Sequence, residues 1–160
     1  MMMGDAGGSP GADLGLVDYF AAGHRNCDSC WADVEAAAEA GNDAALRAGW
    51  QRFDREFRRH LGKEEALLFP AVEAATGMQG AGPAHVMRLE HQQMRGVLDQ
   101  MAAAAERADS SELLDLGDTL HILIQQHNVK EEGVLYPMAE RACAADWPAL
   151  REKLEAFEDG

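Results

Sequence analysis

The stretch HLGKEEALLFP at residues 60–70 returns as HNVKEEGVLYP at residues 127–137. In each copy a histidine, His60 or His127, precedes a glutamate, Glu64 or Glu131, by four residues. On an α-helix this spacing places the imidazole and the carboxylate one turn apart on the same face, so both can reach one metal ion. The repeated stretch therefore predicts a helix with metal ligands in each half of the chain.

The repeat extends beyond these two stretches. The offset of 67 residues that carries His60 onto His127 also carries His24 onto His91. The chain has only six histidines, so these matches at one ungapped offset indicate an internal duplication. We place its halves at about residues 14–77 and 83–143. Each half contributes one lone histidine and one His-xxx-Glu pair, so the candidate metal ligands are His24, His60, Glu64, His91, His127 and Glu131.

Length and composition favour a single all-α domain at residues 13–160. The chain has 160 residues, is rich in helix-forming residues such as alanine and glutamate, and has few β-branched ones. The net charge of −14 argues against binding to nucleic acid or to an anionic membrane surface. No run approaches the roughly 20 apolar residues of a membrane span. Residues 1–12 are expected to form a flexible lead, not a signal peptide, and the cytoplasm is the expected location.

Apolar spacing, capping residues and prolines predict where the helices lie. Asn42 or Asp43 should cap the second helix, and the stretch that begins at Asp109 should cap the fourth. Pro70 and Pro137 should kink or end the helices that carry them. Four amphipathic helices with short links favour an up-down-up-down antiparallel four-helix bundle with duplicated helix pairs. The expected helices are about 13–40, 43–70, 83–107 and 110–137, followed by a short C-terminal helix at about 148–157.

A bound metal is favoured over four core histidines that are satisfied by polar neighbours. Burying two carboxylates among apolar side chains is costly unless a cation compensates them. Imidazole with carboxylate suits Fe, Zn, Cu or Ni, and the chain has no thiolate set for an iron–sulfur cluster. Two carboxylates placed to bridge favour two ions. The His-xxx-Glu spacing differs from the Glu-xx-His spacing of ferritin-type di-iron proteins.

Together, these motifs resemble the hemerythrin-like, or HHE cation-binding, domain over residues 14–138. The resemblance implies an antiparallel bundle around a non-haem di-iron centre, with two irons joined by an oxo or hydroxo bridge. Oxygen-carrying hemerythrins have a fifth histidine, but the positions four residues from His91 hold Met87 and Arg95. The pattern is closer to the di-iron domain of iron-centre repair proteins. By resemblance, four histidines would be terminal ligands and two glutamates would bridge: His24, His60, His91, His127, Glu64 and Glu131.

The resemblance also implies what the centre would do. It would bind a small diatomic ligand, O₂ or NO, for sensing, storage, detoxification or iron-centre maintenance. One alternative is a di-iron enzyme that turns over peroxide, NO or O₂. Another is a bundle that holds zinc or a single ion for structural reasons. The sequence names no protein partner and no oligomeric state. The side chains expected to line the site would favour neutral molecules over ions: Phe20, Phe57, Met94 and Ile124.

Several further polar residues have two interpretations. His85 and His121 have no histidine counterpart in the repeat, and we expect them at the surface or behind the ligands. Glu56 and Glu90 could hydrogen-bond a ligand histidine or line an entry path, or they could face solvent. Glu65 and Glu132, which follow the ligand glutamates, are expected behind the ligands or at the surface.

The spacing Cys27-xx-Cys30 is typical of redox motifs, but here it falls within a predicted helix and follows no strand. Cys27 occupies the place of Met94 in the second half, which is a predicted core position. Packing is therefore favoured over redox chemistry for this pair.

Overall fold

A computed structural model describes residues 14–158. The lead predicted at residues 1–12 lies outside this range. The described residues form helices joined by short links, and this part of the chain contains no strand. The prediction of an all-α fold is confirmed. None of the described helices combines the length and the hydropathy that a bilayer span requires.

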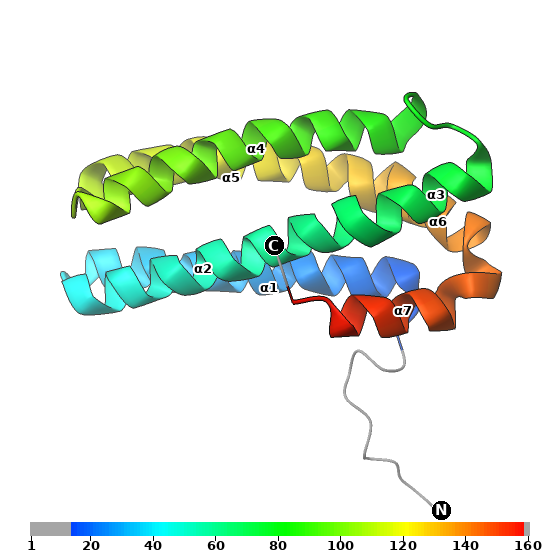
Figure 1. Ribbon diagram of the computed structural model, residues 1–160. Coiled ribbons are helices and arrows are strands. Elements are labelled where there is room, and N and C mark those ends of the chain that lie inside the picture. Colours follow the sequence, from blue (N-terminus) through cyan, green and yellow to red (C-terminus); the bar gives the residue numbers. More distant parts are fainter. Residues whose placement is uncertain (1–13, 159–160) are drawn as a thin grey trace, which may run out of the picture.

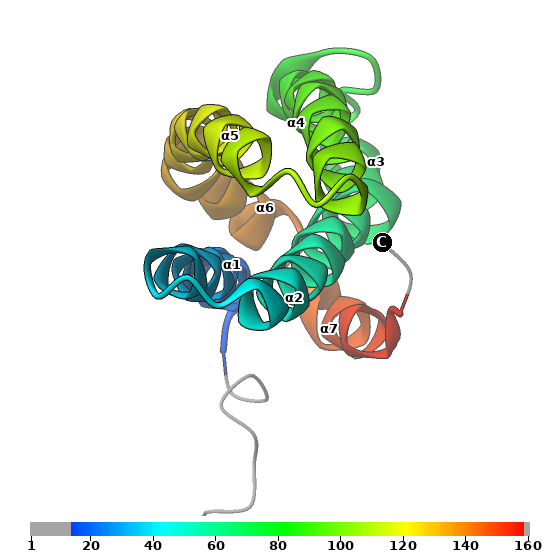
Figure 2. The same ribbon diagram turned by 90° about the vertical axis from the view of Figure 1, so that its left-hand side faces the viewer.

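Four long helices lie around a common interior. Figure 1 shows that each runs opposite to the one before it along the chain. The view along their axes in Figure 2 shows the pair α1 and α2 beside the pair α4 and α5. The helices of each pair are sequence neighbours, and the tightest packing lies within the pairs. Their bounds are Leu16–Glu39 for α1, Asp43–Lys63 for α2, Gly82–Glu106 for α4 and Ser110–Lys130 for α5.

The predicted caps begin two of these helices. The Asn42 side chain accepts a hydrogen bond of 3.0 Å from the backbone N–H of Ala45. Asp109 accepts one of 3.0 Å from the N–H of Glu112. Each bond satisfies one of the donors that the first turn of a helix leaves without an intrahelical partner. Local sequence therefore fixes where α2 and α5 begin.

The helices do not end at the two prolines. A π turn at Glu64–Leu68 leads from α2 into α3 at Phe69–Thr76, and one at Glu131–Leu135 leads from α5 into α6 at Tyr136–Ala142. Proline in an α-helix lacks a donor and clashes with the carbonyl four residues earlier. The wider turn relieves this conflict, since the residue before each proline bonds five residues back instead. The chain stays helical through both prolines.

Two apolar clusters fill the interior at opposite ends of the bundle. One includes Trp31, Phe53 and Leu98, and the other gathers around Phe20 and Leu68 near the π turns. Three histidines of the repeat lie between the two clusters along their helices, and the fourth, His60, lies beside Leu61, the last member of the first cluster on α2. The polar centre is therefore enclosed on both sides by apolar packing.

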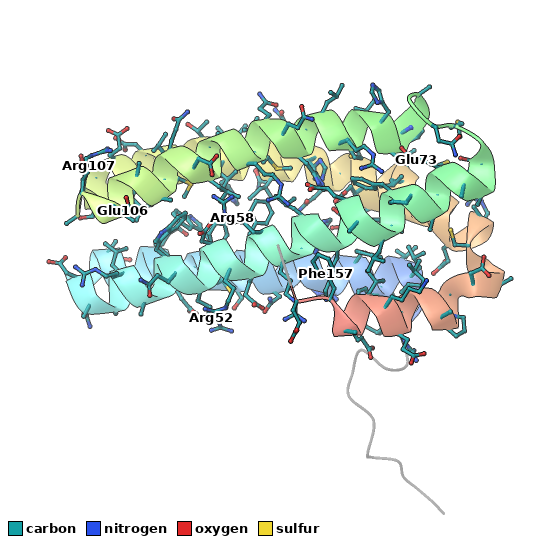
Figure 3. All side chains as sticks on the ribbon, viewed as in Figure 1. Arg52, Arg58, Glu73, Glu106, Arg107 and Phe157 are labelled. Atoms are coloured by element: carbon teal, nitrogen blue, oxygen red, sulfur yellow. The ribbon has the colours of Figure 1, made fainter. Side chains whose placement is uncertain are left out.

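The C-terminal segment covers the outside of α2. A short 3₁₀ turn at Ala144–Asp146 leads into α7 at Trp147–Ala156, which confirms the predicted tail helix. Figure 2 shows α7 outside the four long helices. The Nε of Arg59 on α2 donates a hydrogen bond of 3.0 Å to the carbonyl of Phe157, which is labelled in Figure 3. This bond ties the end of α7 to the bundle.

Candidate metal centre

The structure brings the six predicted ligands together from four long helices and the π turns that extend two of them. All six are buried, and Glu64 and Glu131 have no exposed surface. They form two groups whose potential ligand atoms lie within 4.8 Å of one another. Glu64 and Glu131 belong to both groups. The first group adds His24 and His60, and the second adds His91 and His127.

The two histidine pairs have nearly the same geometry. The ring centroids of His24 and His60 are 4.9 Å apart with an interplanar angle of 58°. Those of His91 and His127 are also 4.9 Å apart, with an angle of 54°. Each pair comes from one helix pair, so the duplicated sequence forms a duplicated half-site.

The π turns begin at the two shared carboxylates. The Phe69 N–H bonds to the Glu64 carbonyl, and the Tyr136 N–H bonds to the Glu131 carbonyl. A π turn adds one residue to the helical repeat, so the buried stripe shifts by one position after it. Leu68 and Phe69 are consequently both buried. The apolar stripe therefore continues beneath the site after each carboxylate.

Three of the four histidines are held from behind by a carboxylate outside the predicted ligand set. Each uses Nδ1 for this contact, which leaves Nε2 for the interior of the cluster. Glu65, Glu90 and Glu132 therefore hydrogen-bond candidate ligands, and Glu132 does so while its side chain stays 46% exposed. The contacts are His24 with Glu132 at 2.7 Å, His91 with Glu65 at 2.8 Å and His127 with Glu90 at 2.9 Å.

Ion pairs on the bundle surface hold two of these carboxylates in turn. Arg95 donates to both oxygens of Glu65 at 3.1 Å. Lys130 contacts Glu90. A further bridge joins α2 to α4, where Arg58, labelled in Figure 3, donates to Asp99 at 2.9 Å. The first two contacts connect Glu65 and Glu90 to neighbouring helices.

Among residues 14–158, no carboxylate contacts Nδ1 of His60, because the repeat is broken at one position. The residue 67 positions before Glu90 is Gly23, which has no carboxylate. A Cβ atom at Gly23 would lie only 2.6 Å from His60 Nδ1, so the imidazole packs directly against the α1 backbone. Burial and the neighbouring His24 hold the pKa of His60 well below its usual value. Glu56 bonds Asn26 at 3.2 Å instead.

We expect Gly23→Ala to displace His60 and weaken metal binding. Alanine favours the helix by about 1 kcal/mol over glycine, so any loss must come from the contact with His60. A loss on the order of tenfold in metal affinity would match that seen when partners of ligand histidines are removed. The measurement is a metal titration of the purified variant. Gly96→Ala is the matched control, since a Cβ there meets nothing within 4 Å; equal affinity of the two variants would contradict the prediction.

The neighbouring carboxylates raise the pKa of two of the candidate ligand histidines. Although burial opposes a charged imidazole, the contact with Glu131 raises the pKa of His24 to about 9. At His91 burial is likewise outweighed by Glu131, Glu64 and Glu65, which raise its pKa to about 11. Burial and the charge of Glu131 raise the pKa of Glu64 to about 7. Buried carboxylates thus draw protons onto two imidazoles, in the place where a bound cation would supply positive charge.

Three buried polar atoms support a cation at this position. Within the described residues, His60 Nε2, Glu64 Oε1 and Glu131 Oε2 are buried and make no hydrogen bond of regular geometry, and the nearest nitrogens to the two carboxylate oxygens are Nε2 atoms of other candidate ligands, His91 at 3.2 Å and His127 at 3.0 Å. All three belong to candidate ligands. Buried polar atoms normally have hydrogen-bond partners, and a buried polar atom without one costs free energy. The nitrogen and carboxylate donors at the site suit a transition metal in type and in number, so the residues present fit such an ion.

Tyr136 lies inside the cluster and was missed as a site residue from the sequence. It is fully buried, and its Oη lies 2.5 Å from Glu64 Oε2, 2.8 Å from Glu131 Oε1 and 3.0 Å from His24 Nε2. Burial and the two carboxylates raise its pKa well above the usual value. The only sequence signal is the change from Phe69 in the first copy to tyrosine in the second.

The remaining candidates lie outside the ligand groups. His121 is exposed and His85 is partly buried, and neither belongs to the clusters found among residues 14–158. Cys27 and Cys30 are buried free thiols packed in the larger apolar cluster. Burial raises the pKa of both thiols, which disfavours the reactive thiolate. These features agree with packing as their role.

We expect Cys27→Ser to leave metal content unchanged. The thiol lies one turn from His24 but belongs to neither ligand group. Serine keeps the volume and adds a buried hydroxyl, so a stability loss of about 1–3 kcal/mol is the expected cost. Metal analysis and thermal unfolding of the variant check both parts. Reduced metal content in Cys27→Ser, with normal content in Cys30→Ser, would show that Cys27 supports the centre.

Comparison with known proteins agrees with this site. The family model of the hemerythrin HHE cation-binding domain matches residues 15–139. An iron-sulfur cluster repair protein, YtfE, of Musicola paradisiaca is 33% identical over 94 residues, which cover 54% of this chain and 42% of the relative. An uncharacterized hemerythrin-like protein of Schizosaccharomyces pombe is 28% identical over 127 residues, which cover 79% of this chain and 60% of that protein. The chain thus spans less than two thirds of either relative. No solved structure matches it significantly.

Proposed function

The chain belongs to the hemerythrin HHE cation-binding domain family, and we propose that it binds two iron ions and a small diatomic ligand, O₂ or NO. The proposed unit is one up-down-up-down four-helix domain at residues 13–160. The observation that carries the proposal is the pair of ligand groups that share Glu64 and Glu131. Two carboxylates common to two sets of histidines are suited to bridge two ions. A single ion would leave one histidine pair without a role.

Each residue has a distinct task in this proposal. His24 and His60 would hold one ion, His91 and His127 the other, and the two shared glutamates would bridge them. Iron bound there would supply redox-active Lewis-acid positions for the diatomic ligand. The carboxylates behind three histidines fix the rings in the orientation that presents Nε2.

The surroundings of the site favour a small neutral ligand. Phe20, Met94 and Ile124 are buried three or four residues from a candidate ligand histidine on the same helix, and the Phe20 ring lies 6.2 Å from that of His60. A recess of about 320 Å³ beside Gly23 reaches His60 from the surface. An apolar interior disfavours entry of ions more than entry of O₂ or NO. We propose this recess as the route from solvent to the site.

Metal analysis combined with an absorption spectrum tests the proposal. The expected result is two irons per chain, a near-ultraviolet and visible spectrum in the oxidised protein, and a spectral change on adding NO under anaerobic conditions. Zinc in place of iron after expression in iron-rich medium would overturn the iron assignment. Sustained consumption of peroxide or NO over many turnovers would replace a binding protein with an enzyme.

Similarity to a protein named for iron-sulfur cluster repair supports a second use of the same centre, iron-centre maintenance. The test mixes the iron-loaded chain with an oxidatively damaged iron–sulfur enzyme and follows recovery of that enzyme's activity. Glu131→Gln is the matched control, because it should lack iron. Equal recovery with both forms would contradict a role in maintenance.

A further inference from the structure

We propose that Tyr136 is itself a metal ligand, binding through its phenol oxygen the ion that His24 and His60 hold. The inference rests on the metal centre proposed above and adds a donor outside the duplicated set of four histidines and two glutamates.

The contacts of the Tyr136 phenol oxygen favour a cation beside it. Its Oη lies within 3.0 Å of two carboxylate oxygens and one imidazole nitrogen. A phenol has one proton, so it can donate fully to only one of the three neighbours. A proton on His24 Nε2 can satisfy the phenol oxygen, but the second carboxylate still brings two electron-rich oxygens together in a buried place. A cation among these atoms removes the conflict, since all four can donate to it.

The spacing of these atoms matches that of neighbouring ligands around one ion. Ligands at right angles on a six-coordinate ion with bonds of about 2.1 Å are about 3.0 Å apart. Tyr136 Oη lies 2.5, 2.8 and 3.0 Å from atoms of Glu64, Glu131 and His24. The His24 Nε2 to Glu131 Oε1 distance is 2.9 Å. The phenol oxygen is therefore placed as a fourth donor beside three predicted ligands.

The second half-site has no such donor. The residue that corresponds to Tyr136 in the repeat is Phe69, which has no oxygen. Its ring centroid lies 5.1 Å from that of His91. The two ions would therefore be inequivalent, with a phenolate on one and an apolar ring beside the other. The ion beside Phe69 keeps one more position for an exogenous ligand.

Binding of the phenol oxygen changes its protonation but involves no electron transfer. The O–H bond breaks as the bond from oxygen to iron forms, and the proton leaves to the buffer. Tyrosine is an established ligand of ferric iron in proteins. A phenolate on ferric iron gives a charge-transfer band in the visible range, and laser excitation in that band enhances the ring vibrations of the bound tyrosine. Both signals are absent when tyrosine only donates a hydrogen bond.

The test uses the full chain loaded with ferrous iron and oxidised in air. Iron content, the visible spectrum and the resonance Raman spectrum are measured on the same sample. We expect the wild type to show the band and the tyrosinate vibrations, and Tyr136→Phe to lose both. The chain has two tyrosines, so Tyr19→Phe is a complete control. Tyr19 accepts a hydrogen bond of 2.9 Å from Lys63 and should leave both signals intact when replaced.

A second measurement covers the case in which Tyr136→Phe fails to fold or to hold iron. Replacing both tyrosines with 3-fluorotyrosine should shift the band, and the shift should persist in the Tyr19→Phe background. Iron-loaded wild type without tyrosinate vibrations would overturn the role of Tyr136 and leave the metal centre standing, as would a band that survives Tyr136→Phe. A wild-type chain that binds no metal would overturn the metal centre, and this inference with it.

Discussion

Glu131→Gln and Glu64→Gln are each expected to empty both metal positions. Each glutamate belongs to both ligand groups, so its loss removes a charged donor from two ions at once. Glutamine keeps the volume of the side chain, so the effect comes from the lost charge and not from a cavity. Removing a hydrogen-bond partner of a ligand costs about 10–100-fold in affinity, so removing a bridging ligand should cost more. Metal analysis after dialysis should find little bound metal.

Single histidine variants provide the comparison that identifies bridging. His60→Ala and His127→Ala each remove a donor from only one of the two groups. They should therefore lose mainly one ion, so that the remaining metal content is near half that of the wild type. Glu152→Ala, an exposed change on α7, should retain all of it. Full metal content in either shared-glutamate variant, or equal losses in the glutamate and histidine variants, would contradict the bridging assignment.

Removal of metal is expected to lower the melting temperature of the chain substantially. An ion that binds only the folded state stabilises it by about 4 kcal/mol at a concentration 1,000 times its Kd. In a chain of this size each 1 kcal/mol corresponds to roughly 2–4 °C. A loss on the order of 10 °C is expected on complete chelation. The two apolar clusters on either side of the site do not depend on the ion, so the metal-free chain should still fold.

Thermal unfolding followed by circular dichroism, with and without a chelator, measures this loss. Re-addition of the metal should restore the original melting temperature. The matched control is Glu131→Gln, whose melting temperature should not respond to the chelator, since its site holds little metal. A wild-type chain that melts at the same temperature in both states would show that metal binding and folding are not coupled.

Much of the fold and of the candidate site could be predicted from the sequence. Helix starts at Asn42 and Asp109 follow from local capping, which depends on residues only three positions apart. The candidate ligands follow from helical periodicity and from the repeat. An i, i+4 pair such as His60 and Glu64 shares a helix face wherever the helix packs, and the duplication doubled that signal. The structure brings the candidate ligands together in one core, as the repeat predicts. Their role as metal ligands stays a prediction.

The tertiary structure alone decided what surrounds these residues. The partner of His91 Nδ1 lies 26 residues away, and Tyr136 meets His24 across 112 residues. Such contacts depend on how the helix pairs dock, which no local pattern encodes. The π turns likewise form where Pro70 or Pro137 conflicts with continued packing of the helix. Helix propensity therefore does not predict the positions of these turns. Gly23 and Glu90 occupy equivalent positions in the repeat. Only the packed structure shows that Gly23 lies against His60 and offers it no carboxylate, while Glu90 contacts His127.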